Sequence, residues 1–192
     1  MNIVGINGSL RPGGITGQMV ERALAGAQQA GAKTEQIDLK NYNIPFCDGR
    51  PDGTYGPVVD TLESKLRRAD VVVIGTPEYR GGYSGVLKNF LDVLRPDVLQ
   101  GKWIALVGVG GGRWGAEGAM NQLRIVLKNM RATVWAEQTS ATGSDVANGK
   151  LNNPDIIQRL ETTGRDLVWT LDHPRGLARL KASLSRRFRK SA

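Results

Sequence analysis

The stretch Asp70–Asp92, DVVVIGTPEYRGGYSGVLKNFLD, decides the fold of this chain. Its first part, Asp70–Gly75, is continuously apolar, as expected for a strand that is covered on both faces of a sheet. Its last part begins a helical apolar stripe that ends before Pro96 and consists of Val86, Leu87, Phe90, Leu91 and Leu94. A buried strand followed by such a helix indicates one βα unit of a parallel sheet.

The same alternation continues along the chain and predicts an α/β fold. Four other apolar runs are expected to form strands: Asn2–Asn7, Lys33–Leu39, Lys102–Val109 and Thr133–Ala136. Helical stripes accompany them and begin at Met19, Val59, Met120 and Ile156. We therefore predict a doubly wound sheet of five parallel strands with helices on both faces. In such sheets, ligands bind at the carboxyl ends of the strands, where the strand order reverses.

The composition limits the possible classes of protein. The 192 residues suffice for one domain with a full core, and 40% of them are hydrophobic. The single cysteine, Cys47, excludes an internal disulfide framework, and with one histidine a metal site is not expected. No signal peptide or membrane-spanning run is evident, so we predict a cytoplasmic protein.

The net charge of +8 comes from the C-terminal end of the chain. Residues 175–192 hold seven Lys or Arg and no acid, whereas the rest is close to neutral. We therefore divide the chain into a domain of residues 1–174 and a basic C-terminal tail of residues 175–192. Four apolar residues of the tail are spaced for one helix face: Leu177, Leu180, Leu184 and Phe188. Such a helix suits an anionic surface, a membrane or nucleic acid; a solvated tail or one packed on its own domain is the alternative.

The loop after the first strand, GSLRPGGIT (Gly8–Thr16), has the composition of a phosphate site. A helix is expected to begin near Thr16, and the free N–H groups of a helix N-terminus attract phosphate. Ser9 and Thr16 add hydroxyl groups, and Arg11 adds a charged donor fork. The alternative is a Gly/Pro turn with Thr16 as an ordinary N-cap. The loop lacks the Lys-Ser/Thr ending of a P-loop, so a nucleoside triphosphate is not favoured.

The loop after the third strand, Thr76–Gly85, combines groups that suit a planar polar ligand. Its glycines allow close backbone approach, while Glu78 and Tyr79 provide polar and aromatic surface. The alternative is a plain turn with Ser84 as the helix N-cap. That interpretation leaves Glu78 and Tyr79 unexplained.

The loop after the fourth strand, GVGGGRWGAEG (Gly108–Gly118), allows two interpretations. Its residues 110–115 match the dinucleotide fingerprint G-x-G-x-x-G, with Glu137 as the acid about one strand later. Because the first loop already offers a better phosphate site, we favour a flat backbone wall beside the ligand. Trp114 in this loop is an open candidate for a ligand contact.

Together these motifs carry a family resemblance. GSLRPGGIT, TPEY–GxxSGxLKNFLD and the Gly-rich loop followed by NQLRIVL resemble the NADPH-dependent FMN reductase family of flavodoxin-like proteins. The resemblance covers about residues 1–170. It implies a five-stranded parallel sheet of order 2-1-3-4-5, with FMN bound at its carboxyl edge.

The resemblance also implies which residues hold FMN. They form three groups: Ser9, Arg11 and Thr16 for the phosphate; Pro77, Glu78, Tyr79, Arg80 and Gly81 for the isoalloxazine ring; Gly110, Gly111 and Gly112 for its other side. No catalytic residue of the protein is implied, because the flavin carries the chemistry.

The expected function is NAD(P)H-dependent reduction of FMN, quinones or related small-molecule acceptors by a ping-pong mechanism. The resemblance implies NADPH or NADH as the reductant and a homodimer or homotetramer as the assembly. One alternative is a non-enzymatic, flavodoxin-like electron carrier, which the near-neutral charge of residues 1–174 disfavours. Another is an adaptor whose basic tail is the working part.

Overall fold

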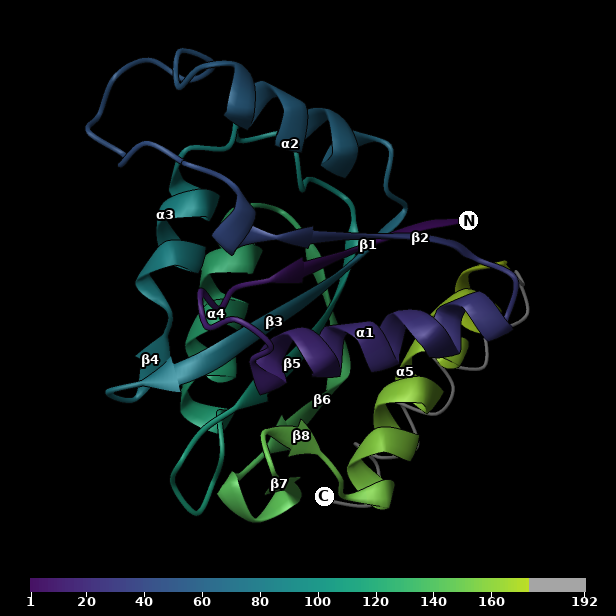
Figure 1. The fold of residues 1–192 in the computed structure, drawn as a ribbon. Coiled ribbons are helices and arrows are strands. Elements are labelled where there is room, and N and C mark those ends of the chain that lie inside the picture. Colours follow the sequence, from purple (N-terminus) through teal and green to yellow (C-terminus); the bar gives the residue numbers. More distant parts are fainter. Residues whose placement is uncertain (173–192) are drawn as a thin grey trace, which may run out of the picture.

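The computed structural model describes residues 1–172 (Figure 1). Along the chain its elements are β1 (Asn2–Asn7), α1 (Ile15–Gln29), β2 (Lys33–Asp38), α2 (Pro57–Arg67), β3 (Val71–Tyr79), β4 (Gly82–Tyr83), α3 (Gly85–Asp92), β5 (Trp103–Val109), α4 (Glu117–Asn129), β6 (Thr133–Ala141), β7 (Val146–Ala147), β8 (Lys150–Leu151) and α5 (Pro154–Asp172). The predicted boundary after residue 174 and the basic tail 175–192 lie outside the described residues.

The five long strands form one parallel sheet in the order β2-β1-β3-β5-β6. Numbered without the short β4, this is the order 2-1-3-4-5, so the predicted topology is confirmed. The register pairs Asn7 of β1 with Gly75 of β3, and Pro77 of β3 with Val109 of β5. The order reverses between β1 and β3, so the loops that follow these strands diverge and leave room for a ligand.

Alternate side chains of the buried strands pack on opposite faces of the sheet. Val72 and Ile74 of β3 belong to the cluster formed with α2, α3 and α4, whereas Val71 and Val73 belong to the cluster formed with α1 and α5. Figure 1 shows these two layers of helices on either side of the sheet. The continuously apolar run in the sequence therefore reflects burial on both faces.

Helices α1 and α5 approach each other closely because glycine replaces larger residues at their crossing. A Cβ added to Gly26 of α1 would lie 2.0 Å from the carbonyl oxygen of Glu161. A Cβ added to Gly164 of α5 would lie 2.0 Å from the carbonyl oxygen of Ala23. This crossing fixes the C-terminal half of α1 against α5.

The third strand extends beyond the predicted end at Gly75. It continues as β3 to Tyr79 and returns as β4, so the predicted loop is largely a β-hairpin. Its two turn residues, Arg80 and Gly81, have φ values of 54° and 79°. Positive φ at both central positions is typical of the type I′ turn that suits a two-residue hairpin. The predicted end of the strand at Gly75, and with it the prediction of a loop from Thr76, was wrong.

The last strand is also longer than predicted, because β6 runs to Ala141 rather than Ala136. Its pairing with β5 shifts register between Ile104 and Leu106. The guanidinium of Arg124 on α4 donates hydrogen bonds to the carbonyl oxygens of Trp135 (2.9 Å) and Ala136 (3.0 Å). The carbonyl oxygens of this irregular part of β6 thus keep hydrogen-bond partners although they leave the regular pairing with β5.

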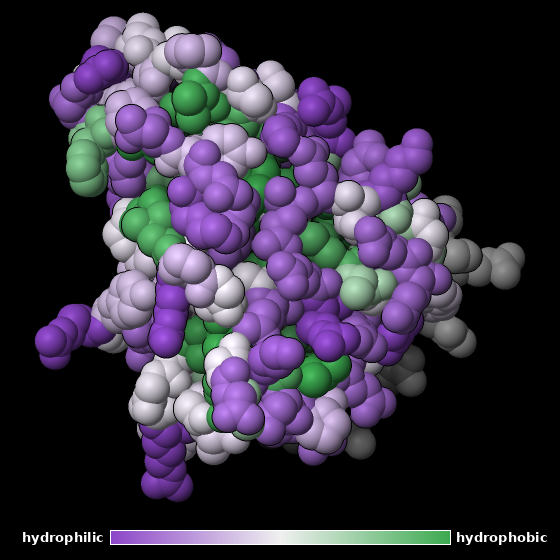
Figure 2. All heavy atoms as spheres, viewed as in Figure 1, coloured by the Kyte–Doolittle hydropathy of each residue, from purple (hydrophilic) through white to green (hydrophobic). Residues whose placement is uncertain are grey.

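The surface in the orientation of Figure 1 is largely hydrophilic, and hydrophobic residues show only in small separate patches (Figure 2). Among residues 1–172, no helix is long and apolar enough to cross a membrane.

Candidate functional site

A cavity of about 400 Å³ lies at the carboxyl ends of β1, β3 and β5. It brings together eight residues that the sequence predicted for FMN: Ser9, Arg11, Thr16, Pro77, Glu78, Tyr79, Gly110 and Gly111. The other three predicted residues, Arg80, Gly81 and Gly112, do not line it. Loops that are distant in sequence therefore meet at one edge of the sheet, as the topology requires.

The first loop is held in shape by short-range hydrogen bonds. The buried side chain of Asn7 accepts one from the N–H of Ser9 (3.1 Å), and the Ser9 hydroxyl accepts one from the N–H of Arg11 (3.2 Å). The Arg11 carbonyl in turn accepts one from Gly14 (3.1 Å). Within residues 1–172, the Arg11 guanidinium forms no ion pair or hydrogen bond, so it is available to an anion.

Helix α1 begins at Ile15, and its N-cap is Gly14 rather than Thr16. Gly14 provides no side-chain cap, so the interpretation of Thr16 as an ordinary N-cap was wrong. Thr16 is buried and lines the cavity, and within the described part of the chain its hydroxyl has no hydrogen-bond partner. The first-turn N–H groups and this hydroxyl thus converge on the cavity at the positive end of the helix dipole.

The predicted ring-binding segment divides at the hairpin turn. Pro77, Glu78 and Tyr79 line the cavity, and Tyr79 is 57% exposed at its rim. Arg80 and Gly81 form the exposed tip of the hairpin, outside the cavity.

The side chains around this hairpin also have structural roles. Glu78 accepts a hydrogen bond from the N–H of Ala119 in α4 (2.9 Å), a role that the sequence did not reveal. Ser84 is the N-cap of α3, as the alternative interpretation held, and its hydroxyl also donates to the carbonyl oxygen of Gly8. The first loop and the β3–β4 hairpin segment are therefore linked directly.

The third loop folds onto itself and presents its backbone to the cavity. The N–H of Gly110 donates to the carbonyl oxygen of Ala141 (3.1 Å), and a Cβ at Gly110 would lie 2.0 Å from the carbonyl oxygen of Gly115. Gly110 and Gly111 line the cavity, which suits the interpretation as a backbone wall. Trp114 is 73% exposed beyond the lining, with the Arg113 guanidinium 5.3 Å from its ring centre.

A fourth wall of the cavity was missed by the sequence reasoning. It belongs to the β7–β8 hairpin and its approach and consists of Gly143, Val146, Asn148 and Gly149. Asn148 and Gly149 have φ values of 50° and 72°, again typical of a type I′ turn. The dipeptide Asn-Gly is the strongest short-range hairpin signal in a sequence, so this element was detectable.

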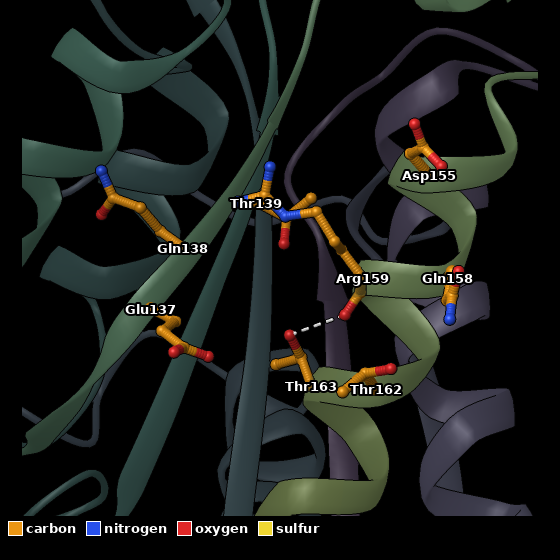
Figure 3. Close-up of a pocket in the computed structure, with 8 residues that line it drawn as sticks. All are labelled: Glu137, Gln138, Thr139, Asp155, Gln158, Arg159, Thr162 and Thr163. Carbon is orange, nitrogen blue, oxygen red and sulfur yellow. Dashed lines mark hydrogen bonds between the residues drawn. The ribbon is translucent and has the colours of Figure 1, made fainter. Parts of the chain in front are cut away.

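A second cavity, of about 430 Å³, lies between the edge strand β6 and helix α5 (Figure 3). Figure 3 shows Glu137 and Thr139 on the strand and Arg159 extending from the helix toward Thr139. Thr163 donates a hydrogen bond to the Arg159 carbonyl oxygen (3.0 Å). Burial, and secondly the charge of Glu137, raise the pKa of Asp166 on the same helix. Glu137 is the acid that the dinucleotide fingerprint required, yet it lines this cavity and not the one beside the third loop.

Comparison with known proteins identifies the family of the chain. A sequence model of the NADPH-dependent FMN reductase family matches residues 1–146. The chain belongs to this family. The resemblance seen in the motifs is thereby confirmed, and the protein is an oxidoreductase that depends on FMN and NAD(P)H.

Two relatives match over most of the chain. The NAD(P)H-dependent FAD/FMN reductase of Geobacillus thermodenitrificans is 32% identical over 90% of this chain and 92% of its own length. The NADPH azoreductase of a Bacillus species is 32% identical over 84% of this chain and 91% of its own. The family assignment therefore extends along nearly the whole described part of the chain.

Solved structures of low sequence identity share the fold. An NADH:FMN oxidoreductase in its apo form is 22% identical, with a TM-score of 0.70 over 88% of this chain and 89% of that one. A flavodoxin from the Archaea is 16% identical, with a TM-score of 0.65 over 90% of this chain and all of that one. At these identities the likeness shows the flavodoxin-like fold alone.

The residues of the cavity fit FMN at both of its ends. The unpaired guanidinium of Arg11, the Thr16 hydroxyl and the open N-terminus of α1 suit a phosphate group. Opposite them, Pro77, Gly110 and Gly111 offer walls with little or no side chain, which suit the edge and face of a flat ring. The cavity is thus lined by hydrogen-bond donors at one end and by flat backbone surfaces at the other.

Proposed function

We propose that the protein catalyses NAD(P)H-dependent reduction of a small-molecule acceptor at the cavity formed by the three predicted loops. FMN, when bound there, supplies hydride and electron transfer. Ser9, Arg11 and Thr16 would bind its phosphate, and the wall residues would fix the position of its ring. The observation that supports this proposal is the convergence of an anion-binding end and a backbone-lined end in one cavity. Arg80, Gly81 and Gly112 would reach the ligand only from the rim, and their roles stay predictions.

The protein's own part in this chemistry is to bind and orient. The first loop is held by hydrogen bonds from Asn7 to Gly14, and the ring-binding segment is fixed to α4 through Glu78. A preformed site loses little freedom on binding, so more of the contact energy contributes to affinity. No side chain of the site is required as a general acid or a nucleophile in this proposal.

A ping-pong mechanism follows if the nicotinamide and the acceptor use the same open side of the cavity in turn. The rim at Tyr79, whose side chain is more than half exposed, offers one such approach. Steady-state kinetics with NADPH and a quinone would then give parallel double-reciprocal lines. Intersecting lines together with a demonstrated ternary complex would show that the two substrates do not share a site.

The acceptor class is proposed to be small and planar, such as FMN, a quinone or an azo dye. The relatives named as azoreductase and FAD/FMN reductase support this class. The direct test is the absorbance spectrum of the protein after addition of FMN, followed by NADPH oxidation with each acceptor. A protein that binds FMN but oxidises no NADPH with oxygen, quinone or dye would instead be a flavodoxin-like electron carrier. A homodimer or homotetramer remains the expected assembly, which sedimentation would measure.

A further inference from the structure

The side chain of Gln18 joins two walls of the cofactor cavity. Its Nε2 donates hydrogen bonds to the carbonyl oxygens of Gly13 (3.0 Å) and Gly149 (2.9 Å), and its Oε1 accepts one from the N–H of Leu151 (3.0 Å). One amide therefore uses both of its donors and its acceptor on backbone groups. The same nitrogen binds both carbonyl oxygens. It therefore holds the first loop directly beside the tip of the β7–β8 hairpin.

The hairpin is also fixed at its base. The carboxylate of Asp145 accepts hydrogen bonds from the N–H of Thr142 (2.7 Å) and from the side-chain amide of Asn153 (2.6 Å). The Asp145 carbonyl oxygen accepts one from the N–H of Asn152 (3.0 Å). Bonds at the base, a two-residue turn at the tip and Gln18 beside the tip make the hairpin a preformed wall and not a mobile lid.

The position of this wall relates to the length of the ligand. The hairpin meets the cavity at its phosphate end, since Gly149 shares a partner with Gly13 of the phosphate loop. FMN ends at its phosphate. FAD continues from that phosphate into a second phosphate, a ribose and an adenine, and this extension needs a way out of the phosphate end. The amide of Gln18 bridges the carbonyl oxygens of Gly13 and Gly149 at this end of the cavity.

We propose that the β7–β8 hairpin, held by Gln18, is a specificity element that closes the phosphate end of the cavity and selects FMN over FAD. Gln18 is a positioning residue in this proposal. The inference rests on the proposed function, because it assumes that the flavin phosphate lies at the first loop.

The test measures the affinities of the full-length protein for FMN, FAD and riboflavin by quenching of flavin fluorescence. We expect the unmodified protein to bind FMN at least about tenfold more tightly than FAD. Gln18→Leu keeps the approximate size of the side chain and removes all three hydrogen bonds. In this variant we expect the affinity for FMN to exceed the affinity for FAD by no more than about threefold. The affinity for riboflavin should change by less than about twofold.

Two further variants separate selectivity from a general loss of structure. Gln28→Leu changes an exposed glutamine of the same helix whose side chain has no hydrogen bond within residues 1–172, and it should leave the ratio unchanged. Gln18→Glu keeps the acceptor for Leu151 and loses the two donor bonds. Its negative charge repels the dianionic phosphate of FMN at least as strongly as the singly charged phosphates of FAD, so we expect a narrowing at least as large as for Gln18→Leu.

The outcomes distinguish this inference from the proposed function. If the unmodified protein binds no flavin, both are overturned. If it binds FMN and FAD equally well, the proposed function stands and the selectivity of the hairpin does not. The inference is also overturned if Gln18→Leu retains its melting temperature and its riboflavin affinity but keeps the original ratio.

Discussion

The carboxylate of Glu78 accepts a hydrogen bond from the backbone N–H of Ala119, 2.9 Å away, and so connects the end of β3 to the first turn of α4. Ala119 is the third residue of that helix, and the N-cap residue Ala116 offers no side-chain partner. Glu78 therefore caps a helix from a neighbouring strand, and its negative charge lies at the positive end of the helix dipole. This hydrogen bond ties one wall of the cavity to α4.

Replacing Glu78 by alanine should destabilise the protein. The substitution removes a helix-capping acceptor, and we expect a loss of about 0.5–2 kcal/mol in the free energy of unfolding. Glu78→Gln keeps an acceptor oxygen and should lose less. The measurement is urea unfolding, with Glu21→Ala as the control because Glu21 is exposed on α1 and has no hydrogen bond within residues 1–172. Equal stabilities of Glu78→Ala and Glu21→Ala would show that the cap contributes nothing.

The crossing of α1 and α5 should tolerate no added methyl group. In Gly26→Ala the new Cβ would lie 2.0 Å from the Glu161 carbonyl oxygen, so the helices must separate. We expect a destabilisation of about 1–3 kcal/mol, the usual range for overpacking. Gly85→Ala is the matched control, because a Cβ at that first-turn position of α3 would have open space around it. A melting temperature of Gly26→Ala equal to that of Gly85→Ala would contradict the close packing of the helices.

The topology and the position of the first loop at the cavity were predictable from the sequence because both depend on strong local patterns. The run Val71–Ile74 could only be a doubly covered strand, and Gly8–Thr16 joins a strand to a helix with phosphate-binding residue types. The end of β3 was missed because Pro77 reads as the end of a strand, yet it continues in register with Val109 of β5. The tertiary pairing outweighs the local signal there.

The roles of Glu78 and Gln18 could not be predicted for a different reason. Their partners, Ala119 and Gly149, lie 41 and 131 residues away in the sequence. Such contacts follow from how the loops meet in space, and no local spacing encodes them. The β7–β8 hairpin was detectable from Asn148-Gly149, but only the fold shows that its tip reaches the cavity.

The base of the β7–β8 hairpin should make stability depend on pH. The hydrogen bond from the Thr142 N–H is the main cause that lowers the pKa of Asp145, and the side chains of Asn153 and Thr142 contribute. A lowered folded-state pKa adds stability that is present above the unfolded value of about 3.9 and is lost as pH falls through the folded value. Asp145→Asn should therefore be less stable than the unmodified protein at pH 7, and the difference should shrink below about pH 4. A difference that stays constant from pH 7 to pH 3 would contradict this linkage.

Contact of the basic tail, residues 175–192, with an anionic surface stays a prediction, because the tail lies outside the described residues. Sedimentation with vesicles that contain anionic lipid would compare the full chain with a version that ends at residue 174. We expect only the full chain to sediment, and added salt should release it because the attraction is electrostatic. Equal sedimentation of the two versions would contradict the hypothesis.

Arg11 should contribute to flavin binding through the phosphate and not through the ring. Its guanidinium lies in the cavity lining and has no ion-pair partner within residues 1–172, so its loss should barely affect the fold. A hydrogen bond to a charged group contributes about 1.5–3 kcal/mol. Arg11→Ala should therefore weaken FMN binding by roughly ten- to hundredfold, as measured by quenching of flavin fluorescence.

Riboflavin provides the internal control, because it carries the same ring and has no phosphate. Its weaker binding should be nearly the same in Arg11→Ala and in the unmodified protein. Arg113→Ala provides a second control, since Arg113 is equally exposed in a loop at the same edge of the sheet but lies outside the cavity. Removing it should leave both affinities unchanged. Equal losses for FMN and riboflavin in Arg11→Ala would mean that Arg11 shapes the cavity as a whole, and the assignment of the first loop to the phosphate would then be wrong.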